Sequence, residues 1–159
     1  GAIRFTKPSA RLRSGRAPAR GLSPAAVEGG RLVGTVRLWD VTAGPNRPAL
    51  LLGPLVVDPA IRNCGVGAAL MRRALDEAKR RGHRVVLLVG DPAYYGRFGF
   101  SAERTGGLWL PGLDDKSRLL GCELTPAALD SARGTIRAPQ PTQRPLVAAV
   151  PALPAPRAA

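Results

Sequence analysis

The stretch from Ala49 to Val89 limits the possible folds more than any other part of the chain. It starts with an almost wholly apolar run, Ala49–Val57, passes through a turn and a helix-like pattern, and ends in a second apolar run, Arg84–Val89. Continuous apolar runs are typical of strands that are buried on both faces of a sheet. Because a connection that contains a helix usually joins parallel neighbours, we predict an α/β protein built around a parallel pair of strands.

The connecting segment, Gly67–Arg81, is predicted to be an amphipathic helix. Its apolar side chains recur at helical spacing and form one stripe: Val66, Leu70, Met71, Ala74, Leu75 and Ala78. On the opposite face, pairs of opposite charge four residues apart, such as Glu77 and Arg81, add about 0.2–0.5 kcal/mol each. Gly82 follows in the position where a left-handed glycine usually ends a helix.

Further elements are expected on both sides of this unit. Ala25–Glu28 and Arg31–Val41 flank a Gly29-Gly30 turn and are predicted to form a β-hairpin. Inside the first apolar run, Gly53-Pro54 predicts a bulge or a splay, because proline has no N–H for the strand ladder. Three more elements are predicted downstream: a short helix over Pro92–Phe98 and strands at Leu108–Pro111 and Arg118–Thr125.

The composition is that of one folded domain with irregular ends. The chain has 159 residues, of which 45% are hydrophobic, and this is enough for a single buried core. We expect an Arg-rich segment at 1–23, a core domain at 24–137 and a Pro/Ala-rich tail at 138–159, where closely spaced prolines oppose regular structure. The sequence has neither a signal-peptide pattern nor an apolar run of about 18 residues. We therefore expect a cytoplasmic protein with no membrane partner.

The net charge of +13 favours anionic ligands and non-specific contact with nucleic acid. The sequence has no interleaving of aromatic and basic residues, no helix-turn-helix pattern and no zinc-ligand spacing. We therefore expect no metal and no specific nucleic-acid partner, although a basic RNA-associated protein stays open as a less favoured alternative.

The turn before the predicted helix, Arg62-x-x-Gly65-x-Gly67, leaves bare backbone amides at a helix N-terminus, where a phosphate group is attracted. A dinucleotide-binding loop would need three glycines directly after the strand. Here seven residues, Asp58 to Cys64, separate Val57 from Gly65, and Leu70 occupies the third glycine position. A Walker-type loop is excluded too, since Gly-Lys-Ser/Thr occurs nowhere in the chain.

Three motifs in order resemble the GNAT family of acetyl-CoA-dependent N-acetyltransferases. They are the strand end at 55–59 (LVVDP), the loop at 62–67 (RNCGVG) and the helix end at 94–100 (YYGRFGF). The segments at 52–55 and 90–95 are most similar to the YhbS-like branch of the family. The resemblance covers about Leu22 to Ile136 and implies the GNAT fold, a mixed, mostly antiparallel sheet with a central splayed parallel pair and helices on both faces.

The resemblance also implies the cofactor, acetyl-CoA, and the residues that hold it. Backbone groups of Leu55 and Val57 would pair with the pantetheine arm. The pyrophosphate would be held by Arg62 and by the backbone amides of Asn63, Cys64, Gly65, Val66, Gly67 and Ala68.

Tyr95 matches the family's general acid, and Tyr94 is interpreted as a packing residue. A tyrosine with a pKa near 10 can reprotonate a thiolate whose thiol has a pKa of about 8.5. The general base stays open between Asp58 and deprotonation through water.

The expected activity is transfer of an acetyl group from acetyl-CoA to a primary amine by direct attack in a ternary complex. The alternative is a non-catalytic acyl-CoA-binding sensor or scaffold with the same fold. The acceptor, a small-molecule or protein amine, stays open, and the protein is expected to be a monomer or a homodimer. The family's first strand and helix normally precede a segment like Arg4-Phe5, and we expect them to be missing here or replaced by another construction.

Overall fold

The structure, a computed structural model, describes residues 8–139. Residues 1–7 of the predicted Arg-rich segment and residues 140–159 of the predicted Pro/Ala-rich tail lie outside the described residues.

The described residues form seven strands, two α-helices and four short 3-10 helices. In chain order these are η1 (Pro8–Leu12), β1 (Ala25–Glu28), β2 (Arg31–Ala43), β3 (Pro48–Val57), η2 (Pro59–Ile61), α1 (Val66–Arg80), β4 (Val85–Val89), α2 (Pro92–Tyr95), η3 (Gly96–Phe98), β5 (Leu108–Trp109), η4 (Lys116–Arg118), β6 (Leu119–Glu123) and β7 (Gly134–Arg137). The predicted hairpin, the long helix and both apolar strands are confirmed, with bounds that differ by one or two residues.

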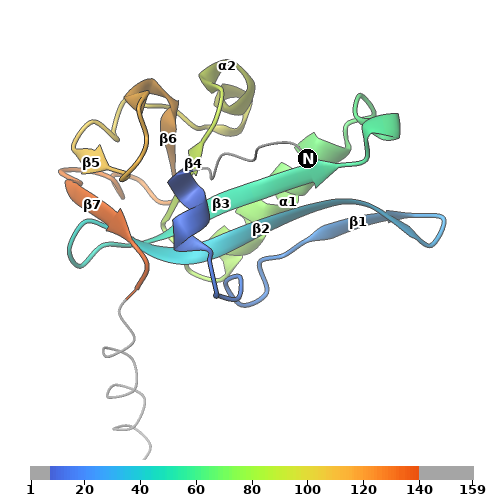
Figure 1. Ribbon diagram of the computed structural model, residues 1–159, viewed down its shortest axis with the longest axis horizontal. Helices are drawn as coiled ribbons and strands as arrows, with labels where there is room; N and C mark the ends of the chain where they lie inside the picture. The colour runs from blue at the N-terminus through green and yellow to red at the C-terminus, as the bar shows by residue number, and fades with distance from the viewer. Residues whose placement is uncertain (1–7, 140–159) are drawn as a thin grey trace, which may run out of the picture.

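The strands form one mixed sheet in the order β5-β7-β2-β3-β4-β6, and β1 pairs with β2 off this path (Figure 1). Most neighbours are antiparallel, whereas β3 and β4 are parallel, as are β5 and β7. The predicted central parallel pair is therefore confirmed, and α1 connects its two strands.

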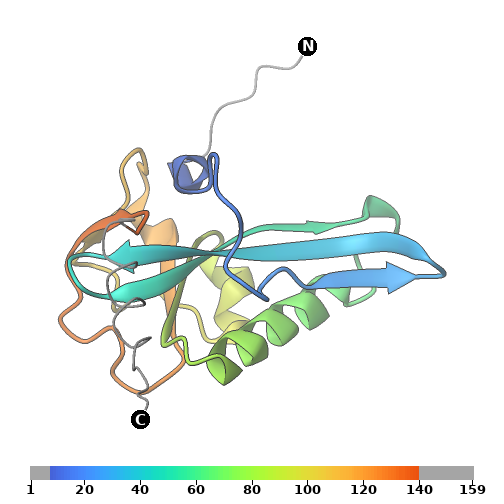
Figure 2. The same ribbon diagram turned by 90° about the horizontal axis from the view of Figure 1, so that it is seen from below.

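The sheet carries one hydrophobic cluster on each face. On one face α1 buries a stripe against the strands, made of Leu70, Met71, Ala74 and Ala78. The opposite face carries a second cluster around Trp39, Leu51 and Leu87, to which η1 adds the half-buried Leu12. Figure 2 shows α1 and η1 on opposite sides of the sheet. Helices thus lie on both faces, as predicted, and η1 on the second face is a short 3-10 turn.

The parallel pair is splayed. β3 pairs with β4 only at Leu50↔Val86 and Leu51↔Leu87, although β3 continues to Val57 alongside β2. Gly53-Pro54 begins two residues after Leu51, the last residue of β3 that pairs with β4, and it is where the sequence predicts the ladder to be interrupted. After Leu51, the edge of β3 that faces β4 therefore pairs with none of the described strands.

Gly44 gives a stability test of the β2–β3 turn. Gly44 has a φ of 79° and donates its N–H to the Thr135 carbonyl at 3.1 Å. A Cβ added to Gly44 would lie 1.9 Å from the Arg133 carbonyl oxygen. Gly29 also has a positive φ, 57°, but open space around it. We expect Gly29→Ala to cost about 1–2 kcal/mol of unfolding free energy for the left-handed backbone. Gly44→Ala is expected to cost about 1–3 kcal/mol more, because the backbone must shift.

Denaturant unfolding of the two variants measures this difference directly. Equal losses in both would show that β7 does not dock against the Gly44 turn.

Candidate active site

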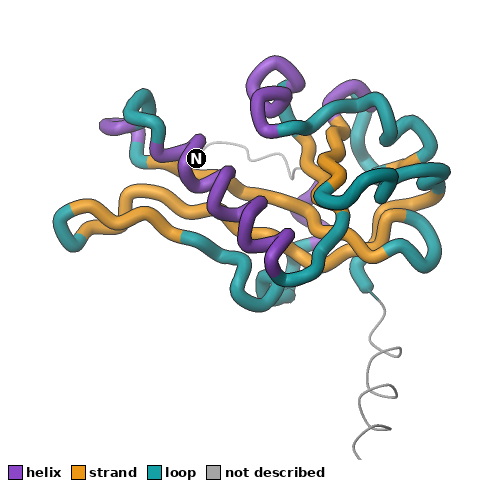
Figure 3. The backbone as a smooth tube through the Cα atoms, turned by 180° about the vertical axis from the view of Figure 1, so that it is seen from behind, coloured by secondary structure: helices purple, strands orange, loops and turns teal. Residues whose placement is uncertain are grey.

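A cavity of about 590 Å³ lies between the unpaired end of β3, the start of α1 and the α2–η3 segment. Its walls are formed by Leu55, Val57, Arg62, Asn63, Gly65, Gly67, Ala68, Tyr94 and Arg97. Figure 3, seen from the α1 side, shows this helix lying across the long strands. Seven of the nine predicted cofactor-binding residues thus line one cavity. The other two, Cys64 and Val66, do not line it: Cys64 is exposed, and the side chain of Val66 packs against the first core cluster.

The start of α1 presents unpaired backbone N–H groups. Gly65 precedes the helix with a left-handed φ of 82°, and no side chain caps the first turn. The N–H of Ala69 donates to the Gly65 carbonyl at 3.0 Å, which is the first backbone hydrogen bond of the helix. The N–H groups before it are therefore available to an anion. The Cys64 N–H is already engaged, since it donates to the Ile61 carbonyl at 3.1 Å.

The edge of β3 that faces the cavity also has free backbone groups. In β2, the Val36 N–H donates to the Pro24 carbonyl at 3.1 Å, away from β3. Because hydrogen-bonded and non-hydrogen-bonded pairs alternate in an antiparallel ladder, its partner Leu55 directs its N–H and C=O to the opposite edge. Val57, two residues further on, does the same. An extended ligand arm can pair with this edge as a strand would.

Of the described residues, two arginines and no carboxylate line the cavity. Arg62 is exposed at the mouth of the loop. The Arg97 Nε donates to the Tyr94 carbonyl at 3.1 Å, and its guanidinium lies 4.7 Å from the centroid of the Tyr94 ring. Free N–H groups and two guanidinium groups together suit a diphosphate.

The two tyrosines differ in their surroundings. The Tyr94 hydroxyl lies 3.4 Å from the position that a Cβ on Gly67 would occupy, so it is part of the cavity wall. The half-buried Tyr95 does not line the cavity; its ring packs against Gly90 at the end of β4 and edge-to-face against Phe100, with 6.2 Å between ring centroids. Burial raises the pKa of Tyr95, nearby Tyr94 raises it further, and Arg118 partly opposes this. The Tyr95 hydroxyl therefore keeps its proton at neutral pH.

The sequence interpretation missed Tyr94 and Arg97 as parts of the cavity. The sequence pattern predicts Tyr94 to be a packing residue, because it lies outside the motif register, and it predicts no role for Arg97. The two residues are three positions apart in a predicted helical segment, which puts them on one face of it. This spacing is the sequence signal that could have identified them as neighbours in the cavity wall.

Two acids near the site have structural roles. Asp58 accepts the Ala60 N–H at 3.0 Å and pairs with Arg31, and these interactions lower the pKa of its carboxyl. Asp91 accepts the Ala93 N–H at 3.0 Å and begins α2. Neither lines the cavity. Asp58 is therefore a weak candidate for the general base, whereas Asp91 fixes the helix that carries the tyrosines.

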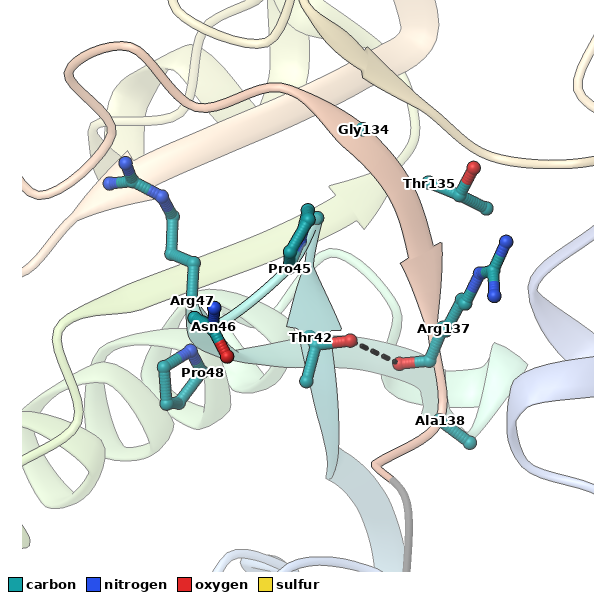
Figure 4. A pocket seen from close by; sticks show the side chains of 10 residues that line it. Thr42, Pro45, Asn46, Arg47, Pro48, Gly134, Thr135, Arg137 and Ala138 are labelled. Carbon is teal, nitrogen blue, oxygen red and sulfur yellow. Dashed lines mark hydrogen bonds between the residues drawn. The ribbon is translucent and has the colours of Figure 1, made fainter.

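A larger cavity of about 750 Å³ lies at the other end of β3, between the β2–β3 turn and β7 (Figure 4). The Thr42 hydroxyl donates to the Arg137 carbonyl at 3.5 Å there. Arg47, on the same wall, is bound to the carbonyls of Ala128 and Asp130. Among the described residues, no carboxylate, histidine, cysteine or tyrosine lines this cavity, so its walls lack an acid–base group that would activate the hydroxyls of Thr42 and Thr135.

Across residues 8–139, no helix is long and apolar enough to span a membrane. The same residues contain no group of three or more histidine, cysteine, aspartate or glutamate side chains that would hold a metal ion.

Comparison with known proteins agrees with this geometry. Residues 4–100 match the Acetyltransferase (GNAT) family, and they make up more than half of the chain. The protein therefore belongs to the GNAT family of acetyltransferases.

Among individual proteins, the chain is similar to YhbS of Escherichia coli K12, an uncharacterized N-acetyltransferase. The two are 35% identical over 72 residues, which are 45% of this chain and 43% of the relative. The match thus spans less than half of the curated relative.

Two crystal structures have similar folds. YhbS from Escherichia coli in complex with CoA has a TM-score of 0.64 and 28% identity, over 72% of this chain and 65% of its own. A GNAT acetyltransferase from Brucella melitensis in complex with acetyl-CoA has a TM-score of 0.61 and 27% identity, over 83% of this chain and 73% of its own.

Proposed function

We propose that the protein transfers an acetyl group from acetyl-CoA to a primary amine by direct attack in a ternary complex. The observation that carries this proposal is the cavity that joins the free edge of β3 to the uncapped start of α1. When bound there, acetyl-CoA would supply an activated acetyl thioester. The two similar structures with CoA and acetyl-CoA support this choice of ligand.

The residues of the chain fit each part of that ligand. The backbone amides of Asn63 and of Gly65 to Ala68, around the start of α1, would hold the diphosphate together with the guanidinium groups of Arg62 and Arg97. The Cys64 amide is not among them, because it donates to the Ile61 carbonyl. The backbone groups of Leu55 and Val57 would pair with the pantetheine arm. Tyr94 would close the cavity wall over Gly67.

We propose Tyr95 as the general acid that protonates the departing thiolate. Its ring lies against Gly90, at the end of β4 and across the splay from β3. Burial raises its pKa, so that the phenol is fully protonated at neutral pH and can donate a proton. We assign no side chain as the general base, since the Asp58 carboxylate is held in a turn with a lowered pKa.

One observation favours a second candidate, an acyl-CoA-binding protein that does not catalyse transfer. Tyr95 is half-buried behind Tyr94 and does not line the cavity, which suits a packing residue as well as an acid. Such a protein would bind coenzyme A and release no thiol from acetyl-CoA when amines are added.

Substitutions of Gly67 test the ligand cavity. A Cβ at this position would meet Tyr94 Oη at 3.4 Å, Val57 Cγ2 at 3.6 Å and Leu55 Cδ2 at 3.9 Å, all ordinary contact distances. Gly67→Ala should therefore fold normally and bind coenzyme A nearly as well as the unchanged protein. Gly67→Val extends two methyl groups into the cavity and should weaken coenzyme A binding at least about tenfold, measured by titration calorimetry.

The melting temperatures of the two Gly67 variants serve as the control. Unchanged coenzyme A affinity in a folded Gly67→Val variant would exclude this cavity as the binding site.

Paired tyrosine variants test the proposed acid. Tyr95→Phe should slow acetyl transfer about 100-fold, within the usual range for general acid catalysis, and leave coenzyme A affinity nearly intact. Tyr94→Phe is the matched variant in the same helix and should reduce the rate much less. Full activity of Tyr95→Phe would remove Tyr95 from the mechanism.

The pH profile gives an independent readout for Tyr95. Burial raises the pKa of Tyr95 above its ordinary value of about 10, so the acid form persists throughout neutral and mildly alkaline pH. The transfer rate should rise with pH as the amine loses its proton, and fall only above about pH 10 as Tyr95 ionises. This alkaline fall should be absent in Tyr95→Phe; a fall that persists there would assign it to another group.

A further inference from the structure

Arg13 lies directly against the point where β3 leaves β4. Its Nη1 atom is 3.6 Å from the position that a Cβ on Gly53 would occupy. Among residues 8–139, apart from the chain neighbours of Gly53, no other atom lies within 4 Å of that position. The half-buried guanidinium group is thus the group nearest to the open space beside the backbone of Gly53.

The surrounding contacts fix this arrangement. Arg16 donates hydrogen bonds to the carbonyls of Leu12 and Asp40, which attach the turn after η1 to β2. The Trp39 indole N–H donates to the Gly53 carbonyl at 2.6 Å. Leu12 and Trp39 both belong to the second core cluster, on the face opposite α1. Arg13 therefore approaches β3 from the side opposite to α1 and its cavity.

The guanidinium group of Arg13 has no carboxylate partner within the described part of the chain. The ion pairs among residues 8–139 involve Arg31, Arg80, Arg81 and Arg104 instead. The sequence outside these residues, 1–7 and 140–159, contains no Asp or Glu. Burial lowers the pKa of Arg13, which is the sign of a cation that has lost water without gaining an anion. An anion from a ligand would compensate this cost.

We propose that the amine acceptor carries an oxyanion, a carboxylate or a phosphate, and that Arg13 binds this group on the η1 side of the splay. Arg13 is then the residue that determines acceptor specificity, and the inference rests on the proposed acetyltransferase function. The planar guanidinium group suits both anions, because it can donate two parallel hydrogen bonds to either.

The position of Arg13 also limits the size of the acceptor. Gly53 lies two residues before Leu55. The backbone of Leu55 would pair with the pantetheine arm. Two residues of extended strand span about 7 Å. The acceptor should therefore be small, with only a few bonds between its amine and its anionic group.

Matched pairs of amines test this inference. The pairs are glycine and glycinamide, β-alanine and β-alaninamide, and ethanolamine phosphate and ethanolamine; the first two probe carboxylate, the third phosphate. Thiol release from acetyl-CoA gives kcat/KM for each, corrected to the unprotonated amine. In at least one pair, the anionic member should exceed its neutral partner about 10- to 100-fold, the range of a charge-assisted hydrogen bond.

Substitution of Arg13 should abolish this preference. Arg13→Ala, and Arg13→Gln as a variant that keeps polarity and length, should lower kcat/KM for the anionic member to that of its neutral partner. Neutral amines and coenzyme A binding should be unaffected. Arg20→Ala removes the same charge from an exposed position in the same segment and should retain the full preference.

Three results would contradict the inference. The first is an equal kcat/KM for both members of every pair with the unchanged protein. The second is an equal loss of kcat/KM for the anionic and the neutral member in the Arg13 variants. The third is loss of the preference in Arg20→Ala, which would show that the net charge of the protein alone causes the preference. In each of these cases acetyl transfer itself persists. Coenzyme A binding without transfer to any amine would instead contradict the proposed function, and the acceptor inference would fall with it.

Discussion

The interruption of β3–β4 pairing after Leu51 is the constraint on which the site depends. A parallel pair normally satisfies the backbone groups of both strands, and here that pairing ends at Leu51↔Leu87 while β3 continues to Val57. The backbone of Leu55 and Val57 therefore needs a partner other than a strand. The same divergence leaves room beside the start of α1, so the unpaired strand edge and the uncapped helix start open into one cavity.

Much of this arrangement could be predicted from the sequence because it is local. The two apolar runs and the helical stripe between them indicate a parallel pair of strands, and Gly53-Pro54 indicates a bulge or a splay in the first of them. The loop glycines are informative for the same reason: Gly65 has the positive φ that a tight entry into α1 requires. Seven of the nine cavity-lining residues, including Leu55 and Gly67, are among those that the resemblance to the GNAT family implies.

The parts that could not be predicted depend on contacts between distant segments. β7, Gly134–Arg137, is a strand only because it pairs with the end of β2 and with β5, and its four residues carry no alternation of their own. β5 is shorter than predicted, since only Leu108 and Trp109 face a partner strand. Tyr94 and Arg13 have their positions for the same reason. Tyr94 lies against Gly67 in the cavity wall, and Arg13 lies near Gly53 on the η1 side of the sheet. The partners in each contact are far apart in the sequence, and no local sequence pattern links them.

The distribution of charge connects the cavity and Arg13. Many acidic side chains in the described residues serve as helix caps or surface partners: Asp58, Asp91 and Asp115 accept N–H groups at helix starts, while Glu77, Glu123 and Asp130 pair with arginines.

Arg13, Arg62 and Arg97 form no ion pair among residues 8–139, and all three lie around the splay or the cavity beside it. The positive charge of the chain is thus uncompensated on both faces of β3, at the position where the strand lacks a neighbour. Coulomb attraction at such a site would act on the proposed anionic donor from one face and on the proposed anionic acceptor from the other. Two ligands of like charge would repel each other if they shared one face. In the proposed reaction, the intervening strand would keep their anionic groups apart while their reacting ends meet at the splay.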